Sequence, residues 1–360
     1  MKFSGTVGVL RDALSPCARV AMTKSPVPIL ANVLLEAEGQ ELRITCSNLD
    51  QTVVAIVPVF VEKSARITVA AAVLARVLDK LATEAECEIT LDAKQDLIVK
   101  CSRSKSTLRT LPADDFPEIK PEFTASLDFE PAVLTKALGA VGYAAETDDT
   151  RAYLCGVYIS SIGSGGIDFV ATNGYRLSLA SLTMDAKFSP IILPSSALKQ
   201  FAGALSKASK AKLSLSASMA MLSVDKLSIT TRTIDGTFPD YRRLVGVPKI
   251  MCAAVKRSEF LGAVNVAGST SNEHAAVNVE FGAGQCTVRG VSADAGSSES
   301  QIDADVENEF VGFFNAHFLA EAILAIDGDV LRVFYNGAKS ALHLFGGNDD
   351  RHAIVMTRAG

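Results

Sequence analysis

The sequence contains no apolar run long enough to cross a bilayer. Its longest uninterrupted stretch, VVAIVPVFV at 53–61, has nine residues and includes Pro58, whereas a spanning helix needs about 20. We interpret it as a buried strand. The opening segment carries Arg11 and Asp12, where a secretory signal needs an unbroken apolar core. We therefore expect a cytoplasmic protein with no membrane partner.

Paired metal ligands and disulfide spacings are also missing. The seven cysteines are odd in number and never form a C-x-x-C pair, and the four histidines never stand at i, i+4. This distribution argues against a disulfide framework and against a zinc site. It is typical of a reducing compartment and predicts no bound metal.

Nucleotide and catalytic motifs are absent as well. No P-loop and no G-x-G-x-x-G after a strand occur, and GSGG at 163–166 is better explained as a flexible hairpin. Asp-x-Asp occurs at 303/305 and 327/329, but the second pair resembles the turn that ends a helix. Serine-rich stretches lack histidine and aspartate in a recognisable order. We predict no enzyme activity and no cofactor. An enzyme acting on nucleic acid through metal-binding carboxylates remains the alternative that an assay would test.

What the sequence does contain is a repeat. Helical periodicity recurs near 7–21, 70–82, 131–145, 195–210, 257–268 and 315–327, so the starts are separated by 63, 61, 64, 62 and 58 residues. Alternating strand patterns lie between these helices, at LRITC (42–46), EITL (88–91), LIVKC (97–101), KLSLS (212–216), LSVDKLSIT (222–230) and LRVFY (331–335). The pattern predicts an α+β protein of similar modules.

One helix on one small sheet buries little surface, so neighbouring modules are expected to pair into three domains. Pro117, Pro121, Gly246 and Pro248 mark two linkers. The predicted domains are 1–122, 123–249 and 250–360.

Charge is polarised along the chain. The basic and acidic counts are 15 and 16 in the first domain, 13 and 10 in the second, and 7 and 14 in the third, which gives −1, +3 and −7. Opposite charge at the two ends suggests head-to-tail association, although two solvated faces would explain it equally well. The candidate edges carry Arg103, Lys105 and Arg109 at one end and Glu299, Asp303 and Asp305 at the other.

Four segments carry a family resemblance: TLPADDFPEI (110–119), RAYLCGV (151–157), ATNGYRL (171–177) and GTFPDYRRL (236–244). Together they resemble the beta sliding clamps, the beta subunits of bacterial DNA polymerase III, and the resemblance extends over the whole chain. It implies three similar domains, each with two helices on antiparallel sheets, in a head-to-tail homodimeric ring around double-stranded DNA. Such a ring is a processivity factor that tethers the replicative polymerase and other replication and repair proteins, and a separate ATP-driven loader opens it.

The resemblance and the charges suggest residues that contact DNA without reading its sequence. The fourth helix is predicted to carry Lys199, Lys207, Lys210 and Lys212, with no acid between them. Similarity adds Lys24, Tyr153 and Arg151. An arginine that the family places in the second helix falls on Ala72 or Val73 here, and Asp148 stands where a neutral polar residue is common.

The resemblance also implies a role for TFPDYRRL. In the family, this segment contributes to a groove for a short linear peptide that ends in leucine and an aromatic ring. The implied groove residues are Leu154, Thr172, Gly174, Tyr175, Arg176, Leu177, Pro239, Arg243, Leu244, Ile354, Val355 and Met356. Apolar walls would supply burial, and arginine stems would widen the floor while their heads bond peptide carbonyls. Alternatively, Tyr241, Arg242 and Arg243 only brace a domain junction. Thr357 and Arg358 replace the proline and methionine that usually follow.

The implied dimer junction is polar in this chain. Its residues are Arg103, Lys105, Ser106, Leu108, Ser269, Thr270 and Glu299, and hydroxyls stand where family members often have apolar side chains. Less apolar burial predicts a dimer that depends more on charge. The alternative to a clamp is a scaffold built from repeats that never encircles DNA.

Overall fold

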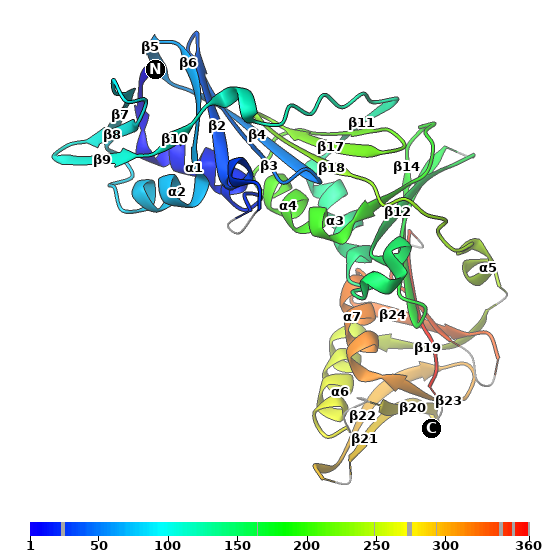
Figure 1. The fold of residues 1–360 in the computed structure, drawn as a ribbon. Helices are drawn as coiled ribbons and strands as arrows, with labels where there is room; N and C mark the ends of the chain where they lie inside the picture. The colour runs from blue at the N-terminus through cyan, green and yellow to red at the C-terminus, as the bar shows by residue number, and fades with distance from the viewer. Residues whose placement is uncertain are drawn as a thin grey trace. The chain divides into compact units, whose positions relative to one another are not determined.

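The computed structural model describes residues 1–22, 26–163, 165–247, 249–271, 276–292, 294–337, 341–347 and 350–358. The chain divides into two compact units. The first contains Met1–Ala132 and Lys199–Thr233, and the second contains Val133–Leu198 and Ile234–Gly360. Each unit combines helices with antiparallel strands (Figure 1).

The helical repeat predicted from periodicity is confirmed. The helices that carry it are α1 (Val7–Ala18), α2 (Ala71–Asp79), α3 (Pro131–Gly142), α4 (Ser195–Leu205), α6 (Arg257–Ser269) and α7 (Ala316–Ala325). A short α5 (Arg242–Val245) was not predicted, and 3-10 turns occupy Pro28–Ala31, Ala113–Asp115 and Asp149–Leu154. Several helices end earlier than predicted; α4 stops at Leu205 and not near 210.

The first unit contains two antiparallel sheets. One has the order β5-β1-β7-β8-β9, with β5 at Phe60–Lys63, β1 at Lys2–Thr6, β7 at Glu86–Leu91, β8 at Leu97–Cys101 and β9 at Ser104–Leu108. The other has the order β10-β6-β2-β3-β4-β18-β17-β16-β11. Its strands are β10 (Thr110–Leu111), β6 (Ala65–Ala70), β2 (Asn32–Glu38), β3 (Glu41–Ser47), β4 (Gln51–Pro58), β18 (Leu227–Arg232), β17 (Met219–Val224), β16 (Ala211–Leu215) and β11 (Ala125–Phe129). Helices α1 and α2 lie side by side, and α1 packs on β3 and β4.

The second unit is built on a twelve-stranded antiparallel sheet of order β15-β12-β13-β14-β26-β25-β24-β19-β22-β21-β20-β23. Its strands are β15 (Ile191–Pro194), β12 (Gly156–Ile162), β13 (Gly166–Thr172), β14 (Arg176–Thr183), β26 (Arg351–Val355), β25 (Leu342–Phe345), β24 (Val330–Tyr335), β19 (Ile250–Lys256), β22 (Gly296–Val306), β21 (Gln285–Ser292), β20 (Ala276–Gly282) and β23 (Phe310–Asn315). Helix α6 packs beside α7 and on β21 and β22. A Cβ at Gly290 would lie 1.9 Å from the Ala267 carbonyl oxygen, so glycine permits this close approach.

Two strand predictions were wrong in detail. LSVDKLSIT is a hairpin and not one strand, because β17 and β18 meet at a turn where Asp225 adopts a positive φ of 45°. VVAIVPVFV is divided between β4 and β5, which belong to different sheets, and Phe60 is 65% exposed. Period-two alternation continues through a tight turn or a change of sheet, so it does not reveal either break. β12 and β13 pair as far as Ile162 and Gly166, as the hairpin predicted at GSGG requires, and Ser164 within it lies outside the described residues.

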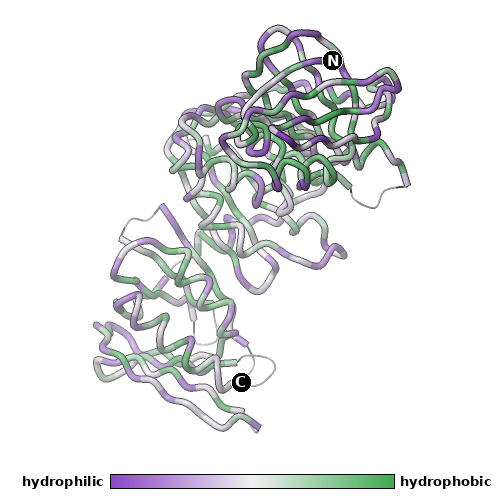
Figure 2. Tube along the Cα trace, turned by 90° about the vertical axis from the view of Figure 1, so that its left-hand side faces the viewer, coloured by the Kyte–Doolittle hydropathy of each residue, from purple (hydrophilic) through white to green (hydrophobic). Residues whose placement is uncertain are grey.

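Burial follows the two periodicities. Apolar positions of the helices and inward positions of the strands form the cores, and Figure 2 shows hydrophobic segments alternating with hydrophilic ones along the strands and helices. The seven cysteines are free, and six are buried. Burial raises the pKa of the Cys46, Cys87, Cys252 and Cys286 thiols to about 12, so they are packing residues and not nucleophiles.

Within the described ranges, no helix has the length and hydropathy that a bilayer crossing requires.

Candidate peptide groove and association surfaces

A cavity of about 130 Å³ opens in the second unit beside the TFPDYRRL segment. Its walls come from four parts of the chain that the sheet brings together. The lining residues are Leu154, Thr172, Gly174, Arg176, Leu177, Pro239, Asp240, Tyr241, Leu244, Ile354 and Met356. Most of this lining is apolar, so the cavity suits an aliphatic or aromatic side chain.

Two aromatic side chains of the TFPDYRRL segment, Phe238 and Tyr241, anchor it in the core. Phe238 stacks on Tyr158 with ring centroids 4.7 Å apart. Tyr241 is 3% exposed, and its hydroxyl donates to a carboxylate oxygen of Asp168 and lies 3.5 Å from the Ser160 hydroxyl. Burial and the bond to Asp168 raise the pKa of the Tyr241 phenol, which stays protonated and can donate. The motif therefore has a rigid base.

The NGYRL turn forms the opposite wall and is held by its own side chains. Asn173 accepts hydrogen bonds from the backbone N–H groups of Tyr175 at 3.0 Å and Arg176 at 3.1 Å. Thr172 donates to the Arg176 carbonyl oxygen at 2.7 Å, and Gly174 supplies the positive φ of 87° that the turn requires. This geometry leaves Tyr175 63% exposed at the surface.

Arg176 is committed to its own unit. Its guanidinium forms an ion pair with Glu321 and donates to the Tyr143 carbonyl oxygen. It lies 4.3 Å from the Phe318 ring centroid and 5.1 Å from that of Tyr143. The guanidinium of Arg176 is therefore held by groups of its own unit, and the residue also lines the cavity.

A second cavity, of about 480 Å³, lies next to the first and shares Met356 with it. Tyr175, Asn315, Phe318, Thr357 and Arg358 complete its lining. The segment after β26 is fixed there, because Met356 N–H donates to the Tyr175 carbonyl oxygen at 2.9 Å and Arg358 N–H donates to the Phe313 carbonyl oxygen at 2.8 Å.

Nine of the twelve predicted groove residues thus line the first cavity. Tyr175 lines the second cavity instead. Val355 is fully buried, and Arg243 is 86% exposed and pairs with Asp240 at 3.0 Å; neither lines either of these two cavities. The prediction missed Asp240 and Tyr241 as lining residues, although both lie inside the motif that it singled out.

The predicted lysine helix needs correction. Lys199 lies on α4, but the helix ends at Leu205, so Lys207 and Lys210 follow it, and Lys212 lies on β16, 3.7 Å from Asp128. Lys199, Lys207 and Lys210 are exposed and form no ion pair with any described residue. They remain a cationic surface. Lys24 lies outside the described residues.

Arg151 and Tyr153 lie on the 3-10 turn Asp149–Leu154 in the second unit. Arg151 forms an ion pair with Glu146, which offsets its charge, and Tyr153 is 37% exposed. Asp148 caps this turn by accepting from the Thr150 N–H at 3.0 Å, and that bond holds the pKa of its carboxyl below the usual range. The acidic residue therefore has a local structural role.

Each unit presents a strand edge that no described strand covers. β9 is the last strand of its sheet and carries the exposed Lys105, with Arg103 just before it. β22 pairs with β21 through 303 and with β19 only from 304 to 306, so within the described part of the chain no strand covers the other side of its first half. Backbone groups on such edges are available for another strand.

Most of the side chains predicted at the dimer junction are already buried or hydrogen-bonded within the chain. Leu108 is 8% exposed, the Thr270 and Ser298 hydroxyls bond each other, and Ser269 donates to the Val266 carbonyl oxygen at 2.7 Å. Ser106, on β9, is partly exposed.

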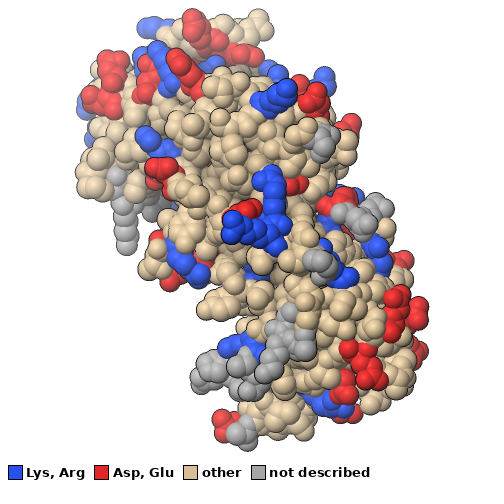
Figure 3. Space-filling view, turned by 90° about the vertical axis from the view of Figure 1, so that its right-hand side faces the viewer, with Lys and Arg blue, Asp and Glu red and all other residues tan. Residues whose placement is uncertain are grey.

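The charged side chains near these edges differ in whether an opposite charge of the same chain pairs with them. Arg289 forms ion pairs with both Glu280 and Glu299, and Arg109 pairs with Asp96 at 2.8 Å. Asp303 and Asp305 on β22 are exposed. Figure 3 shows one group of acidic side chains low on the right of the face in view and another at its top. A partner strand at the β22 edge would meet the exposed Asp303 and Asp305.

Among the described residues, no cluster of histidine, cysteine, aspartate or glutamate side chains could hold a metal ion.

Comparison with known proteins places the chain in one family. Family models for the N-terminal and central domains of the DNA polymerase III beta subunit match residues 1–120 and 128–240. The beta sliding clamps of Pseudomonas putida and Pseudomonas aeruginosa are 27% and 28% identical to the chain, and each alignment covers 99% of both sequences. A crystal structure of the Pseudomonas aeruginosa sliding clamp bound to griselimycin superimposes with a TM-score of 0.95 over 100% of both chains, at 24% identity.

Proposed function

The chain belongs to the family of DNA polymerase III beta subunits, the sliding clamps, and from this premise we propose that two copies close head to tail into a ring around duplex DNA. As a member of this family it is a processivity factor, a non-catalytic subunit that keeps a polymerase on its template. The proposed partners are sequence-independent double-stranded DNA, a second copy of the chain, the polymerase and an ATP-driven loader. The proposed domains are 1–122, 123–249 and 250–360, and the proposed location is the cytoplasm.

Two of the open strand edges among the described residues support the ring. β9 of one copy and the first half of β22 of the other would pair as adjacent strands, which satisfies the backbone groups that both leave open. Arg103 and Lys105 would then approach Asp303 and Asp305. Because the contact uses different surfaces on the two copies, it closes into a ring only if the rotation permits. Two identical contacts meet that condition in a dimer.

A closed ring around the duplex would keep the protein on DNA without tight contacts. A ring lined by twelve helices, each about 10 Å wide, has a circumference of about 120 Å and an opening of roughly 28 Å. A duplex about 20 Å across passes through with room for water. Lys199, Lys207 and Lys210 would attract phosphates from a distance. Arg151, Tyr153 and Lys24 are further proposed contacts.

The two cavities support a peptide-docking role. We assign the leucine of a short linear motif to the first cavity, whose walls include Leu177 and Leu244, and the aromatic residue to the second, between Tyr175 and Phe318. Arg243 is free of the core and can reach a bound peptide from the rim. Because Thr357 and Arg358 are polar, the second cavity would favour aromatic residues that also carry a hydrogen-bonding group.

The observation that carries the proposal is the pair of unpaired, oppositely charged strand edges on one chain. Sedimentation tests it directly: the ring predicts a mass of twice 38.0 kDa. A Lys105→Glu variant should dissociate into monomers, because it places like charges together. An Asp303→Lys partner variant should restore the dimer when mixed with it. A monomeric wild-type chain would contradict the ring and favour a scaffold that does not encircle DNA.

A further inference from the structure

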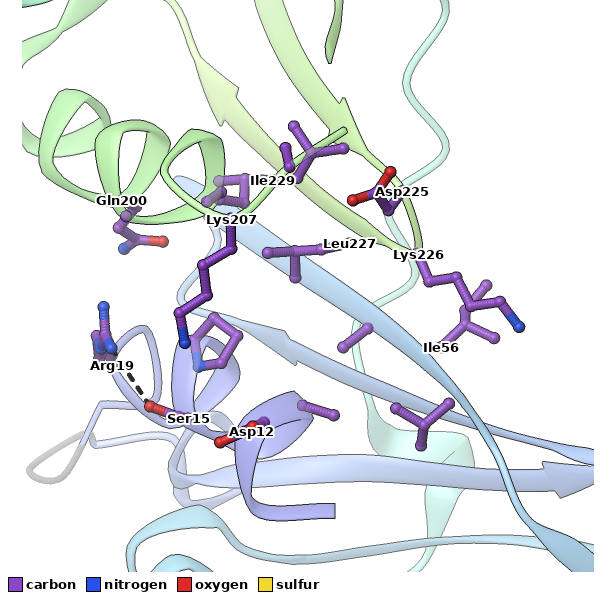
Figure 4. Close-up of a pocket in the computed structure, with 18 of the residues that line it drawn as sticks. Asp12, Ser15, Arg19, Ile56, Gln200, Lys207, Asp225, Lys226, Leu227 and Ile229 are labelled. Atoms are coloured by element: carbon purple, nitrogen blue, oxygen red, sulfur yellow. Dashed lines mark hydrogen bonds between the residues drawn. The ribbon is translucent and has the colours of Figure 1, made fainter. Parts of the chain in front are cut away.

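A third cavity, distinct from the peptide groove, lies in the first unit. It measures about 470 Å³ and lies between α1 and α4, above β4, β17 and β18 (Figure 4). Its floor is apolar and consists of Ala55, Val57, Val224, Leu227 and Ile229. Small-molecule sites of proteins occupy about 300–1,000 Å³ and have mainly apolar walls. The cavity therefore has the size and lining of a ligand site.

The space exists because the two helices face each other with small residues. Ala13 and Pro16 line it from α1, and Gly203 and Ala204 line it from α4. A Cβ added at Gly203 would meet only the Arg19 Nη1 atom, at 3.7 Å. At this position a larger side chain would project into the cavity without a clash against backbone.

Two cations converge at one end of the cavity. Arg19 extends from the end of α1 to α4, as its distance to the Gly203 position shows, and its Nη2 donates to the Ser15 hydroxyl at 3.3 Å. Lys207 follows Gly203 by four residues, and Figure 4 shows its ammonium reaching down toward α1, on the same side as Arg19. Neither cation forms an ion pair with a described residue, so an anion between them would gain two favourable interactions.

The other charges around the cavity do not cancel this pair. Asp225 lies at the opposite end and accepts hydrogen bonds from the backbone and hydroxyl of Ser209. Lys226 points away and pairs with Glu41 at 3.1 Å. Asp12, on α1, is the remaining acid in the lining and is exposed to water. It would weaken, but not remove, the attraction for an anion.

We infer that this cavity binds a small amphipathic anion, with its apolar body on the floor and its anionic group between Arg19 and Lys207. The two cations favour an anionic group, and the apolar floor favours an apolar body of one or two rings. A phosphodiester of DNA would use the cations but leave the floor empty. The inference does not depend on the proposed ring.

The test uses the full chain and anilinonaphthalene sulfonate, whose fluorescence rises on binding. A saturable titration with one site per chain is expected. Phenylnaphthylamine, the same ring system without the sulfonate, should bind about 25-fold more weakly, since it loses a contribution of about fivefold from each of the two cations.

Single substitutions test separately whether binding needs the open cavity and whether it needs the two cations. Gly203→Leu places a side chain in the space between α1 and α4 while improving helix propensity, and it should weaken saturable binding about tenfold. Arg19→Ala and Lys207→Ala should each weaken sulfonate binding about fivefold and leave phenylnaphthylamine binding unchanged. Asp12→Asn should strengthen sulfonate binding, because it removes a like charge. Lys212→Ala, an exposed lysine of the same unit outside the cavity, is the matched control and should have no effect.

Undiminished binding by the Gly203→Leu variant would overturn the inference, as would the lack of a saturable site. An equal loss in the Lys212→Ala control would also overturn it, because the attraction would then come from the overall charge.

Discussion

The ion pair between Arg176 and Glu321 is the best place to test how the groove is built. Arg176 is 8% exposed and lies between the rings of Phe318 and Tyr143, while Glu321 is 29% exposed and reaches it from α7. Replacing Glu321 by glutamine keeps the size of the side chain and one acceptor oxygen but leaves the buried guanidinium without a counter-charge.

The cost follows from burial. Breaking a fully buried pair costs about 3–5 kcal/mol, and an exposed pair contributes about 0–1 kcal/mol. With one partner buried and the other partly exposed, Glu321→Gln should lower the free energy of unfolding by about 2 kcal/mol. Peptide affinity should fall as well, because Arg176 lines the first cavity and Phe318 lines the second.

The assay is urea unfolding, followed by far-ultraviolet circular dichroism, together with fluorescence polarisation of a labelled peptide ending in leucine and phenylalanine. His317→Ala is the matched control. His317 lies 3.2 Å from the same Glu321 carboxylate but is 70% exposed, so its loss should cost less than about 0.5 kcal/mol. Equal effects of the two substitutions would refute the claim that this carboxylate holds a buried arginine.

Three further predictions concern a buried hydroxyl, a histidine pair and the dimer. Tyr241→Phe removes the donor to Asp168 and should cost about 1.5–3 kcal/mol of unfolding free energy with little change in peptide affinity, measured by the same two assays; an unchanged stability would contradict the assigned bond. His343 and His352 are buried 2.9 Å apart, and burial lowers their pKa values to about 4 and about 2. The unfolded chain takes up protons near pH 6.5 and the folded chain does not, so stability is complete above that pH and should fall by about 2–3 kcal/mol from pH 7.5 to 5.5; a His343→Gln/His352→Gln variant with the same pH dependence in urea would exclude this cause. Raised salt should shift sedimentation from dimer to monomer, because the proposed junction relies on charge and hydroxyl groups; an undiminished dimer at high ionic strength would refute that dependence.

The sequence predicted the helices better than the strands. Six amphipathic stripes recur at nearly constant spacing, and each became a helix because its apolar face has a sheet to cover. The hairpin at Asp225 and Lys226 was missed, since neither residue belongs to the glycine and asparagine pairs that mark a two-residue turn. Helix α5 was missed because four residues are too short for a period to show.

For the candidate groove, the sequence predicted most of the lining residues but not how each side chain is held. The motif residues came from family resemblance, and nine of them do surround one cavity. Residue type alone could not tell how the two arginines differ: Arg176 is buried and pairs with Glu321, which lies 145 positions away in the sequence, whereas Arg243 is exposed and pairs with the neighbouring Asp240. Alternation along β26 separates Ile354 and Met356 from Val355, but it could not tell which of the two faces borders the groove before the strand's neighbours were known.

Retention on DNA tests the central claim most directly. After loading, the chain should remain bound to a closed circular duplex at a salt concentration that removes phosphate contacts, and it should be lost within minutes once the circle is cut to give free ends. Equal retention on circular and linear duplexes would contradict enclosure as the basis of DNA binding.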